Sequence, residues 1–182
     1  GKDLLLLILL IGVLFGFRLG SFPLANPDEG RYAEVPREMV ASHDYVTPRL
    51  DGVKYFEKPP LFYWCVALSV KAFGTNEWAL LAWPALFGLA GCLLAYGAGR
   101  RFYGRTAGLA AAAVLATSLI YYALSRLLII DMAVSVLISG ALFAFMVGVE
   151  EPPGPRRRRL FYALYVCAAL ATLTKGLIGF LL

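Results

Sequence analysis

The chain has 182 residues, of which 60% are hydrophobic, with a mean hydropathy of +0.71 and a formal net charge of +5. Soluble domains contain about 45–50% apolar residues, so this composition excludes an ordinary soluble domain and indicates an integral membrane protein. The net charge does not indicate nucleic-acid binding, because the basic residues cluster at the ends of apolar segments, where membrane topology accounts for them. We therefore expect no nucleic-acid partner.

Five apolar segments are predicted to cross the bilayer as helices, since a crossing takes about 20 residues. Their approximate bounds are 4–22, 78–98, 106–123, 132–149 and 160–182. The expected fold class is all-α, in the form of a multi-span helical bundle with one long external loop over residues 24–77. The chain starts without Met and stops inside an apolar run, so we interpret residues 1–182 as one membrane domain within a longer protein.

The long loop concentrates charge. Seven of the twelve acids of the chain lie between Asn26 and Pro60, together with five basic residues. The acids are Asp28, Glu29, Glu34, Glu38, Asp44, Asp51 and Glu57, and the bases are Arg31, Arg37, Arg49, Lys54 and Lys58. Such a stretch is either a solvated loop or an active site at the membrane surface, and composition alone does not decide between them.

The sequence at residues 26–29, Asn-Pro-Asp-Glu, predicts a helix start, with Asn26 as the N-cap and Pro27 at the first helical position. The helix would place Asp28, Arg31 and Tyr32 on one face, at spacings of three and four residues. Pro36 is predicted to kink this helix or to end it near Val35.

Leu61–Phe73 is apolar but has only 13 residues, which is short for a crossing and suits a helix at the membrane surface. If this segment does not cross and the N-terminus is cytoplasmic, the arginines at 100, 101 and 105 and at 156–159 face the cytoplasm, as the positive-inside rule requires. If it crosses, both clusters lie outside. The first arrangement is preferred, and it places the acids Asp28 and Asp131 on the same external face.

Individual charged residues have alternative explanations. Asp28 suits a general base or a metal ligand, or a helix-start acid favoured by the helix dipole. Arg126, near Asp131, suits a structural ion pair or a substrate contact. Lys175 lies in an apolar span, where a charge is costly and usually functional; it would contact a lipid phosphate or pair with an acid beyond the end of the chain.

Two motifs, DEGRYAEVPREM at 28–39 and YFEKPPLFYW at 55–64, followed by Ser125-Arg126 and Asp131, resemble the amino-terminal part of a GT-C glycosyltransferase. More narrowly they resemble the bacterial aminoarabinose (lipid A) transferases, which are distant relatives of the protein O-mannosyltransferases. The resemblance covers the whole chain. Gly30 stands where family members commonly have Pro, and Pro36 stands where many have another residue, which affects local helix geometry more than the chemistry.

The resemblance implies that a sugar is transferred, with inversion, from a polyprenyl phosphate to an acceptor hydroxyl outside the bacterial plasma (inner) membrane. The acceptor would be a lipid A-like glycolipid or a protein, and membrane lipids would surround the enzyme. By position, Asp28 matches the catalytic acid and Lys58 the lysine that holds the lipid phosphate. The further residues implied in substrate binding are Glu57, Arg31, Tyr32, Tyr55, Asp131 and Arg126. The sugar and any metal requirement stay open, a divalent metal being one option.

Other functions make different predictions. A protein O-mannosyltransferase-like enzyme would share this chemistry and differ in its acceptor. A transporter or flippase would place ionisable residues near the bilayer midplane, whereas most acids here lie in the external loop. A scaffold without catalytic activity predicts that Asp28→Asn changes no transfer activity.

Overall fold

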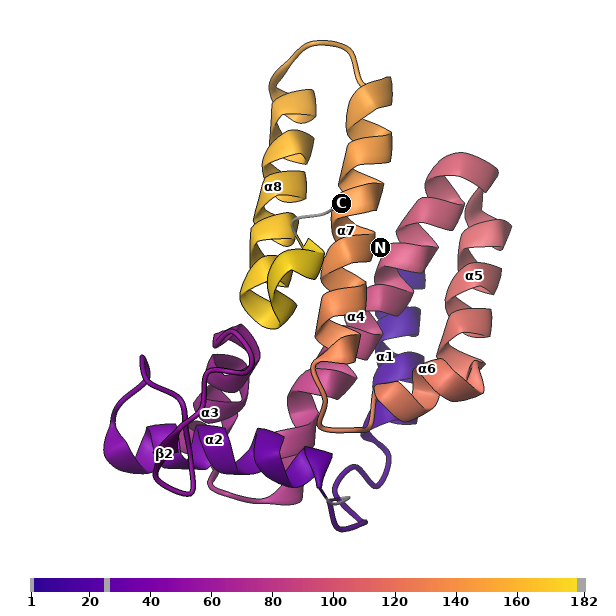
Figure 1. The fold of residues 1–182 in the computed structure, drawn as a ribbon. Helices are drawn as coiled ribbons and strands as arrows, with labels where there is room; N and C mark the ends of the chain where they lie inside the picture. Colours follow the sequence, from indigo (N-terminus) through magenta and orange to yellow (C-terminus); the bar gives the residue numbers. More distant parts are fainter. Residues whose placement is uncertain (1, 25–26, 180–182) are drawn as a thin grey trace.

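The computed structural model of the chain describes residues 2–24 and 27–179, and the regular elements of these residues are helices apart from one short hairpin (Figure 1). The elements are α1 (Lys2–Gly16), α2 (Asp28–Ser42), β1 (Arg49–Leu50), β2 (Val53–Lys54), α3 (Leu61–Phe73), α4 (Glu77–Tyr103), α5 (Arg105–Thr117), α6 (Leu119–Leu124), α7 (Asp131–Glu150), α8 (Pro155–Lys175) and the 3₁₀ helix η1 (Gly176–Gly179).

Two helical hairpins, α4–α5 and α7–α8, stand side by side, and α1 packs against α4 (Figure 1). Glycine allows the α4–α5 hairpin to close tightly. A Cβ atom added at Gly108 would lie 2.6 Å from the carbonyl oxygen of Tyr96 and 2.8 Å from the amide nitrogen of Arg100. Small residues at such positions let two membrane helices approach until their backbones touch.

A lower layer, formed by α2, the β-hairpin and α3, sits beneath the upright helices (Figure 1). The two parts share a hydrophobic core, in which Phe62 and Val66 of α3 pack with Leu81 of α4, Leu128 of the α6–α7 connection and Ala133 of α7. Because these residues are buried, the lower layer is held against the bundle by apolar packing as well as by polar contacts.

Three of the helices within the described residues are long and apolar enough to cross a membrane: α4, α7, and α8 together with η1. α1 has 15 residues and is about 22 Å long, which is shorter than the roughly 30 Å hydrocarbon core. Its helix ends at Gly16, six residues before the predicted end of the first span. The crossing of the membrane by α1 and by α5, which has 13 residues, stays a prediction.

Two helix boundaries differ from the sequence prediction. The predicted span 106–123 is divided at Ser118, whose extended ψ of 123° separates α5 from α6. Pro36 does not end α2 near Val35, because the helix continues to Ser42. Pro36 is buried beside Val35 and Met39, which pack against Tyr63 of α3. This tertiary packing offsets the backbone hydrogen bond that a proline removes from a helix.

α2 begins at Asp28, one residue later than predicted, and the predicted cap Asn26 lies outside the described residues. α4 begins at Glu77, shortly after the end of α3 at Phe73. The Asn76 side chain caps α4 by accepting a hydrogen bond from the Ala79 N–H at 2.9 Å. This capping bond satisfies one of the amides that a helix N-terminus leaves without an intrahelical partner.

The charged ends of the molecule lie where the topology prediction puts them relative to each other. The α4–α5 and α7–α8 turns, which carry the two arginine clusters, are at the upper end of the bundle, and α2 is at the lower end (Figure 1). The Asp28 and Asp131 segments both lie at the lower end. Their assignment to the external side of a membrane remains a prediction.

Candidate active site

The first turn of α2 places Asp28, Arg31 and Tyr32 on one face, as their spacing predicts. The guanidinium of Arg31 forms an ion pair with the Asp28 carboxylate. The Asp28 side chain is nevertheless 63% exposed. An exposed carboxylate at a helix N-terminus is accessible to a substrate, and the helix dipole favours its negative charge.

Glu57 is the centre of a second group of contacts. Its carboxylate lies 3.7 Å from the Arg31 guanidinium and 3.3 Å from the Lys58 ammonium, and it accepts a hydrogen bond from the Tyr55 hydroxyl. The hydrogen bond from Tyr55, then that from Lys58, lowers the pKa of the Glu57 carboxyl below its usual value. Arg31 therefore connects Asp28 to Glu57, and Glu57 connects both to Lys58.

The β-hairpin positions the 55–58 segment. Its strands pair antiparallel, with Arg49 opposite Lys54, around a turn at Asp51 and Gly52, where both residues have positive φ. The Gly52 N–H donates to both carboxylate oxygens of Glu38 at 3.2 Å, which fixes the hairpin to α2. The chain that leaves the hairpin is thus directed back over the face of α2 that carries Arg31.

The second loop contributes Asp131, the first residue of α7, whose carboxylate pairs with the Lys175 ammonium at the end of α8. The structure therefore gives Lys175, which is half-buried, an acid partner within this chain. Burial, and after it the negative charge of Asp131, raises the pKa of the Tyr32 hydroxyl to about 12. The negative charges of Tyr55 and Glu57 act in the same direction on the pKa of Tyr32 as that of Asp131.

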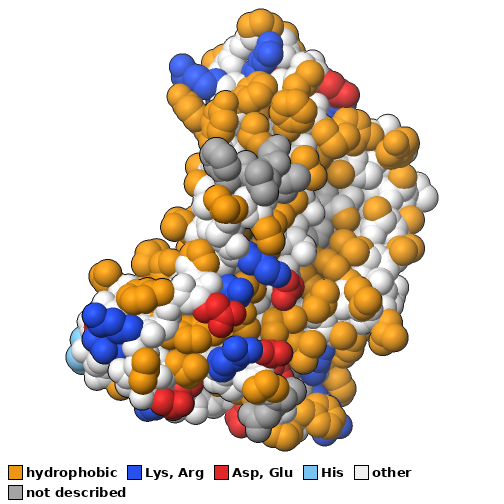
Figure 2. All heavy atoms as spheres, in the orientation of Figure 1, with side chains coloured by type: hydrophobic (Ala, Val, Ile, Leu, Met, Phe, Trp, Pro, Cys, Tyr) orange, Lys and Arg blue, Asp and Glu red, His pale blue; other side chains and the backbone are white. Residues whose placement is uncertain are grey.

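A groove with a volume of about 400 Å³ adjoins these residues. Its charged lining comes from Glu57, Lys58 and Lys175, and Pro59 and Pro60 supply part of its apolar wall. Figure 2 shows acidic and basic side chains gathered where the lower layer meets the upright helices, below a largely hydrophobic surface. The groove therefore places two lysines, from distant parts of the sequence, beside one opening.

Arg126 has contacts that separate it from this group. Its guanidinium donates to the backbone carbonyls of Phe15, Phe17 and Arg18 at 2.9, 2.8 and 3.1 Å, and it lies over the Tyr122 ring. Five of the other predicted site residues form the connected group: Asp28, Arg31, Tyr55, Glu57 and Lys58. Asp131 pairs with Lys175, which lines the groove, and the Tyr32 ring packs against Phe62 and Tyr63. The carbonyl contacts give Arg126 a structural task at the end of α1, and its substrate role stays a prediction.

Glu29 is a functional candidate that the sequence reasoning did not single out. It is only 6% exposed, and its carboxylate accepts a hydrogen bond from the Leu128 N–H at 2.6 Å. A signal was present in the sequence, because Glu29, Ala33 and Pro36 are spaced by four and three residues and so share a helix face. That face contains small or apolar neighbours, which indicates burial of the glutamate.

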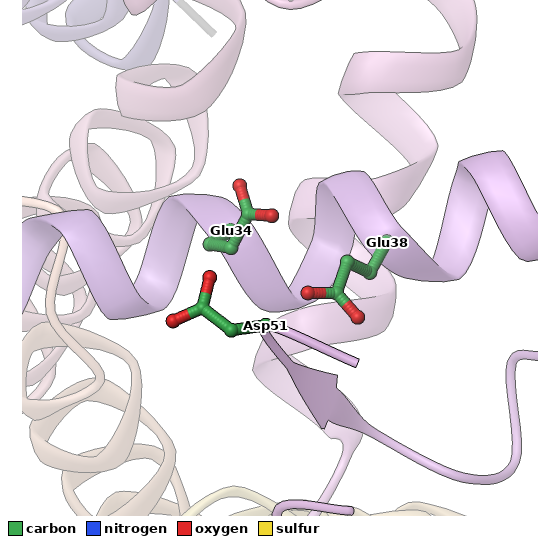
Figure 3. Close-up of side chains that lie close together, drawn as sticks. All are labelled: Glu34, Glu38 and Asp51. Carbon is green, nitrogen blue, oxygen red and sulfur yellow. The ribbon is translucent and has the colours of Figure 1, made fainter. Parts of the chain in front are cut away.

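Three carboxylates, Glu34, Glu38 and Asp51, lie within 4.8 Å of one another where the hairpin turn meets α2 (Figure 3). Glu34 is paired with Arg37 at 2.5 Å, and Glu38 accepts the Gly52 amide. These partners account for the arrangement of both glutamates, so the cluster alone does not indicate a metal site.

Comparison with known proteins places this geometry in a family. The sequence model of the dolichyl-phosphate-mannose-protein mannosyltransferase family matches residues 57–182. The undecaprenyl phosphate-α-4-amino-4-deoxy-L-arabinose arabinosyl transferase 2 of Sodalis glossinidius is 34% identical over 174 residues, which is 95% of this chain and 32% of the relative. The corresponding transferase of Aeromonas salmonicida is 35% identical over 164 residues, 88% of this chain and 30% of the relative.

The fold matches that of a solved transferase. The crystal structure of ArnT from Cupriavidus metallidurans bound to undecaprenyl phosphate superimposes with a TM-score of 0.90 at 34% sequence identity, over 97% of this chain and 33% of that chain. The predicted all-α, multi-span membrane fold is thereby confirmed. The chain spans about a third of the length of the relatives that it matches.

Proposed function

Because the chain belongs to the dolichyl-phosphate-mannose-protein mannosyltransferase family, we propose that the complete protein is a membrane glycosyltransferase. It takes an aminopentose from undecaprenyl phosphate and transfers it to a hydroxyl of a lipid A-like glycolipid, with inversion. The observation that carries this proposal is the groove in which Lys58 and Lys175 lie beside one opening, connected through Glu57 and Arg31 to the exposed carboxylate of Asp28.

The two lysines supply what the leaving group requires. When the bond between the sugar and the lipid phosphate breaks, negative charge develops on the departing phosphate, and fixed cations beside it stabilise the transition state. Lys58 is positioned by Glu57 at 3.3 Å, and Lys175 by Asp131. Each lysine thus has a carboxylate that holds its ammonium in place while leaving donors for a phosphate oxygen.

Asp28 suits the other half of the reaction. The acceptor hydroxyl must lose a proton as its oxygen attacks the anomeric carbon, and a carboxylate within hydrogen-bond reach can take or orient that proton. The exposure of Asp28 supports this role, and its ion pair with Arg31 holds the carboxylate on the face of α2 that also faces Glu57. The protein would act at the outer face of a bacterial inner membrane.

The direct test supplies the purified complete protein with an undecaprenyl-phosphate aminopentose and a lipid A acceptor, followed by mass spectrometry of the lipids. Formation of the glycosylated lipid, with release of undecaprenyl phosphate, is the expected result. Peptide acceptors are included in parallel, since the family is that of the protein mannosyltransferases. Transfer to peptides alone would replace the lipid acceptor, and transfer to neither class would contradict the proposal.

A further inference from the structure

Two neighbouring acids at the start of α2 lie in opposite environments. The Asp28 side chain is 63% exposed, whereas Glu29 is 6% exposed. Consecutive residues of an α-helix point about 100° apart, so one of the two faces the site while the other faces the protein interior. The chemistry proposed for Asp28 leaves the buried glutamate without an assigned task.

Glu29 joins two loops that are far apart in the sequence. Its Oε1 atom accepts from the N–H of Leu128, a residue with 0% exposure, at 2.6 Å. Leu128 precedes Asp131 by three residues in the connection between α6 and α7. A hydrogen bond from a buried amide to a carboxylate is short and strong, and its loss leaves a buried donor unsatisfied.

The same connection holds the chain at a second point. Arg126, two residues before Leu128, donates to the carbonyls of Phe15, Phe17 and Arg18 at the end of α1. The stretch between α1 and α2 is thus fixed at both of its ends by residues of one short loop. Other backbone hydrogen bonds of that loop are local, such as those from Arg126 to Ala123 and from Ile129 to Leu127.

We propose that Glu29 is a positioning residue: by binding the Leu128 amide it fixes the first turn of α2, and with it Asp28, relative to the loop that begins α7 at Asp131. The inference rests on the proposed function for the role of Asp28, but the contact itself does not. In this role Glu29 binds neither donor nor acceptor. Its effect on catalysis comes through the place of its neighbour.

The proposal predicts a specific kinetic change in the complete protein. Glu29→Ala lowers kcat by about tenfold to a hundredfold, because a shift of about 1 Å in a catalytic group costs up to about 10²-fold. The KM for the undecaprenyl-phosphate donor changes by less than about threefold, since the groove residues that would bind the phosphate are untouched. Glu29→Gln, which retains an acceptor oxygen, restores most of the lost turnover.

Two further measurements separate positioning from a general structural role. In an Asp28→Asn background, Glu29→Ala lowers the residual turnover by less than about twofold, because residues that act as one unit are not additive. Hydrogen exchange followed by mass spectrometry shows faster exchange over residues 125–131 in Glu29→Ala. Glu77→Ala is the matched control, since Glu77 is an exposed acid in the first turn of α4, and it leaves both turnover and this exchange at wild-type values.

Each outcome discriminates. Unchanged exchange over 125–131 in Glu29→Ala would overturn the contact, and an additive loss of turnover in the double variant would overturn the action through Asp28. Faster exchange in Glu29→Ala together with wild-type turnover in Asp28→Asn would retain the contact and reject the catalytic role of Asp28, which belongs to the proposed function.

Discussion

The molecule has two charged ends, and both contain ion pairs between residues distant in the sequence. At the upper end, the Asp3 carboxylate of α1 forms an ion pair with the Arg105 guanidinium at 2.6 Å. The Glu150 carboxylate of α7 forms one with the Arg101 guanidinium at 3.1 Å. At the lower end, Arg31 reaches Glu57 at 3.7 Å and Lys175 reaches Asp131. The presence of long-range ion pairs therefore does not distinguish a candidate site from a structural end.

The two ends differ in the ratio of basic to acidic residues and in whether the charged residues border a groove. The upper end has more cations than acids, and the run Arg156–Arg159 directly follows Pro155, the first residue of α8. Such a cationic end suits contact with the cytoplasm and with lipid phosphates. At the lower end Asp28 and Glu57 share Arg31 as a partner, Glu57 also pairs with Lys58, and Glu57 and Lys58 line a groove. Matched charges beside an opening can exchange a protein partner for a substrate group.

The largest expected effect comes from Asp28. Asp28→Asn keeps the size of the side chain and removes its charge, and it should lower turnover by about 10²–10⁴-fold, the usual value of general-base help. Steady-state transfer to a lipid acceptor measures this, with donor binding and membrane insertion near wild type. Arg158→Gln, an exposed residue of the upper end, is the control and should retain full turnover. Equal losses in the two variants would erase the difference between the ends.

The next largest expected effect is a loss of affinity for the lipid donor when Lys58 is replaced. Lys58→Ala removes a cation from the groove and should weaken binding of undecaprenyl phosphate by about tenfold to a hundredfold, the cost of losing a charged hydrogen bond. Lys58→Arg should retain part of the affinity, since it keeps the charge with a different geometry. Binding of the lipid in detergent, measured by microscale thermophoresis, checks this. An unchanged affinity in Lys58→Ala would exclude the role in phosphate binding.

A substitution in the α4–α5 hairpin at the upper end should lower the stability of the protein and leave its affinity for the donor unchanged. A Cβ atom added at Gly108 meets the Tyr96 carbonyl oxygen at 2.6 Å, and Gly108→Ala should lower the free energy of unfolding by about 1–3 kcal/mol through overpacking. Thermal unfolding in detergent measures the change, and the affinity for undecaprenyl phosphate at a temperature below the transition should stay the same. Loss of affinity without loss of stability would connect the hairpin to the site.

The smallest effect concerns pH. The Tyr55 and Lys58 hydrogen bonds lower the pKa of Glu57 in the folded protein, so its contribution to stability is present above the ordinary carboxyl pKa and is lost as the pH falls through the lowered value. Wild type should therefore melt slightly above Glu57→Gln at neutral pH, and the gap should close on acidification. A gap that widens towards acidic pH would contradict the sign of the shift.

The sequence predicted which side chains share the first turn of α2 better than it predicted the helix boundaries, and the catalytic and binding roles of those side chains stay predictions. Asp28, Arg31 and Tyr32 share a helix face because the spacing of three and four residues is local. The Lys175–Asp131 pair could not be foreseen in the same way, because it depends on how α8 packs against α7. The passage of α2 through Pro36 likewise depends on burial against Tyr63 of α3, which overrides the local preference of proline.

Glu29 and Ser118 illustrate two further limits. Glu29 was counted with the charged loop because residue type alone suggests exposure, while its helix face, shared with Ala33 and Pro36, suggested burial. The predicted span 106–123 is divided at Ser118, and the residues around Ser118 include no proline or glycine from which this break could have been predicted. Local signals predict which residues can meet on one helix, whereas contacts between helices decide which of them do.

The central claim is that the two charged ends face opposite sides of the membrane, with the candidate site outside. A membrane-impermeant maleimide tests it in intact cells, after Cys65, Cys92 and Cys167 are replaced and single cysteines are placed at Val53, which is 70% exposed, or at Tyr103, which is 83% exposed. We predict that Val53→Cys reacts in intact cells and that Tyr103→Cys reacts only after permeabilisation. Reaction of both positions from the same side, or of Tyr103→Cys alone from outside, would contradict the account.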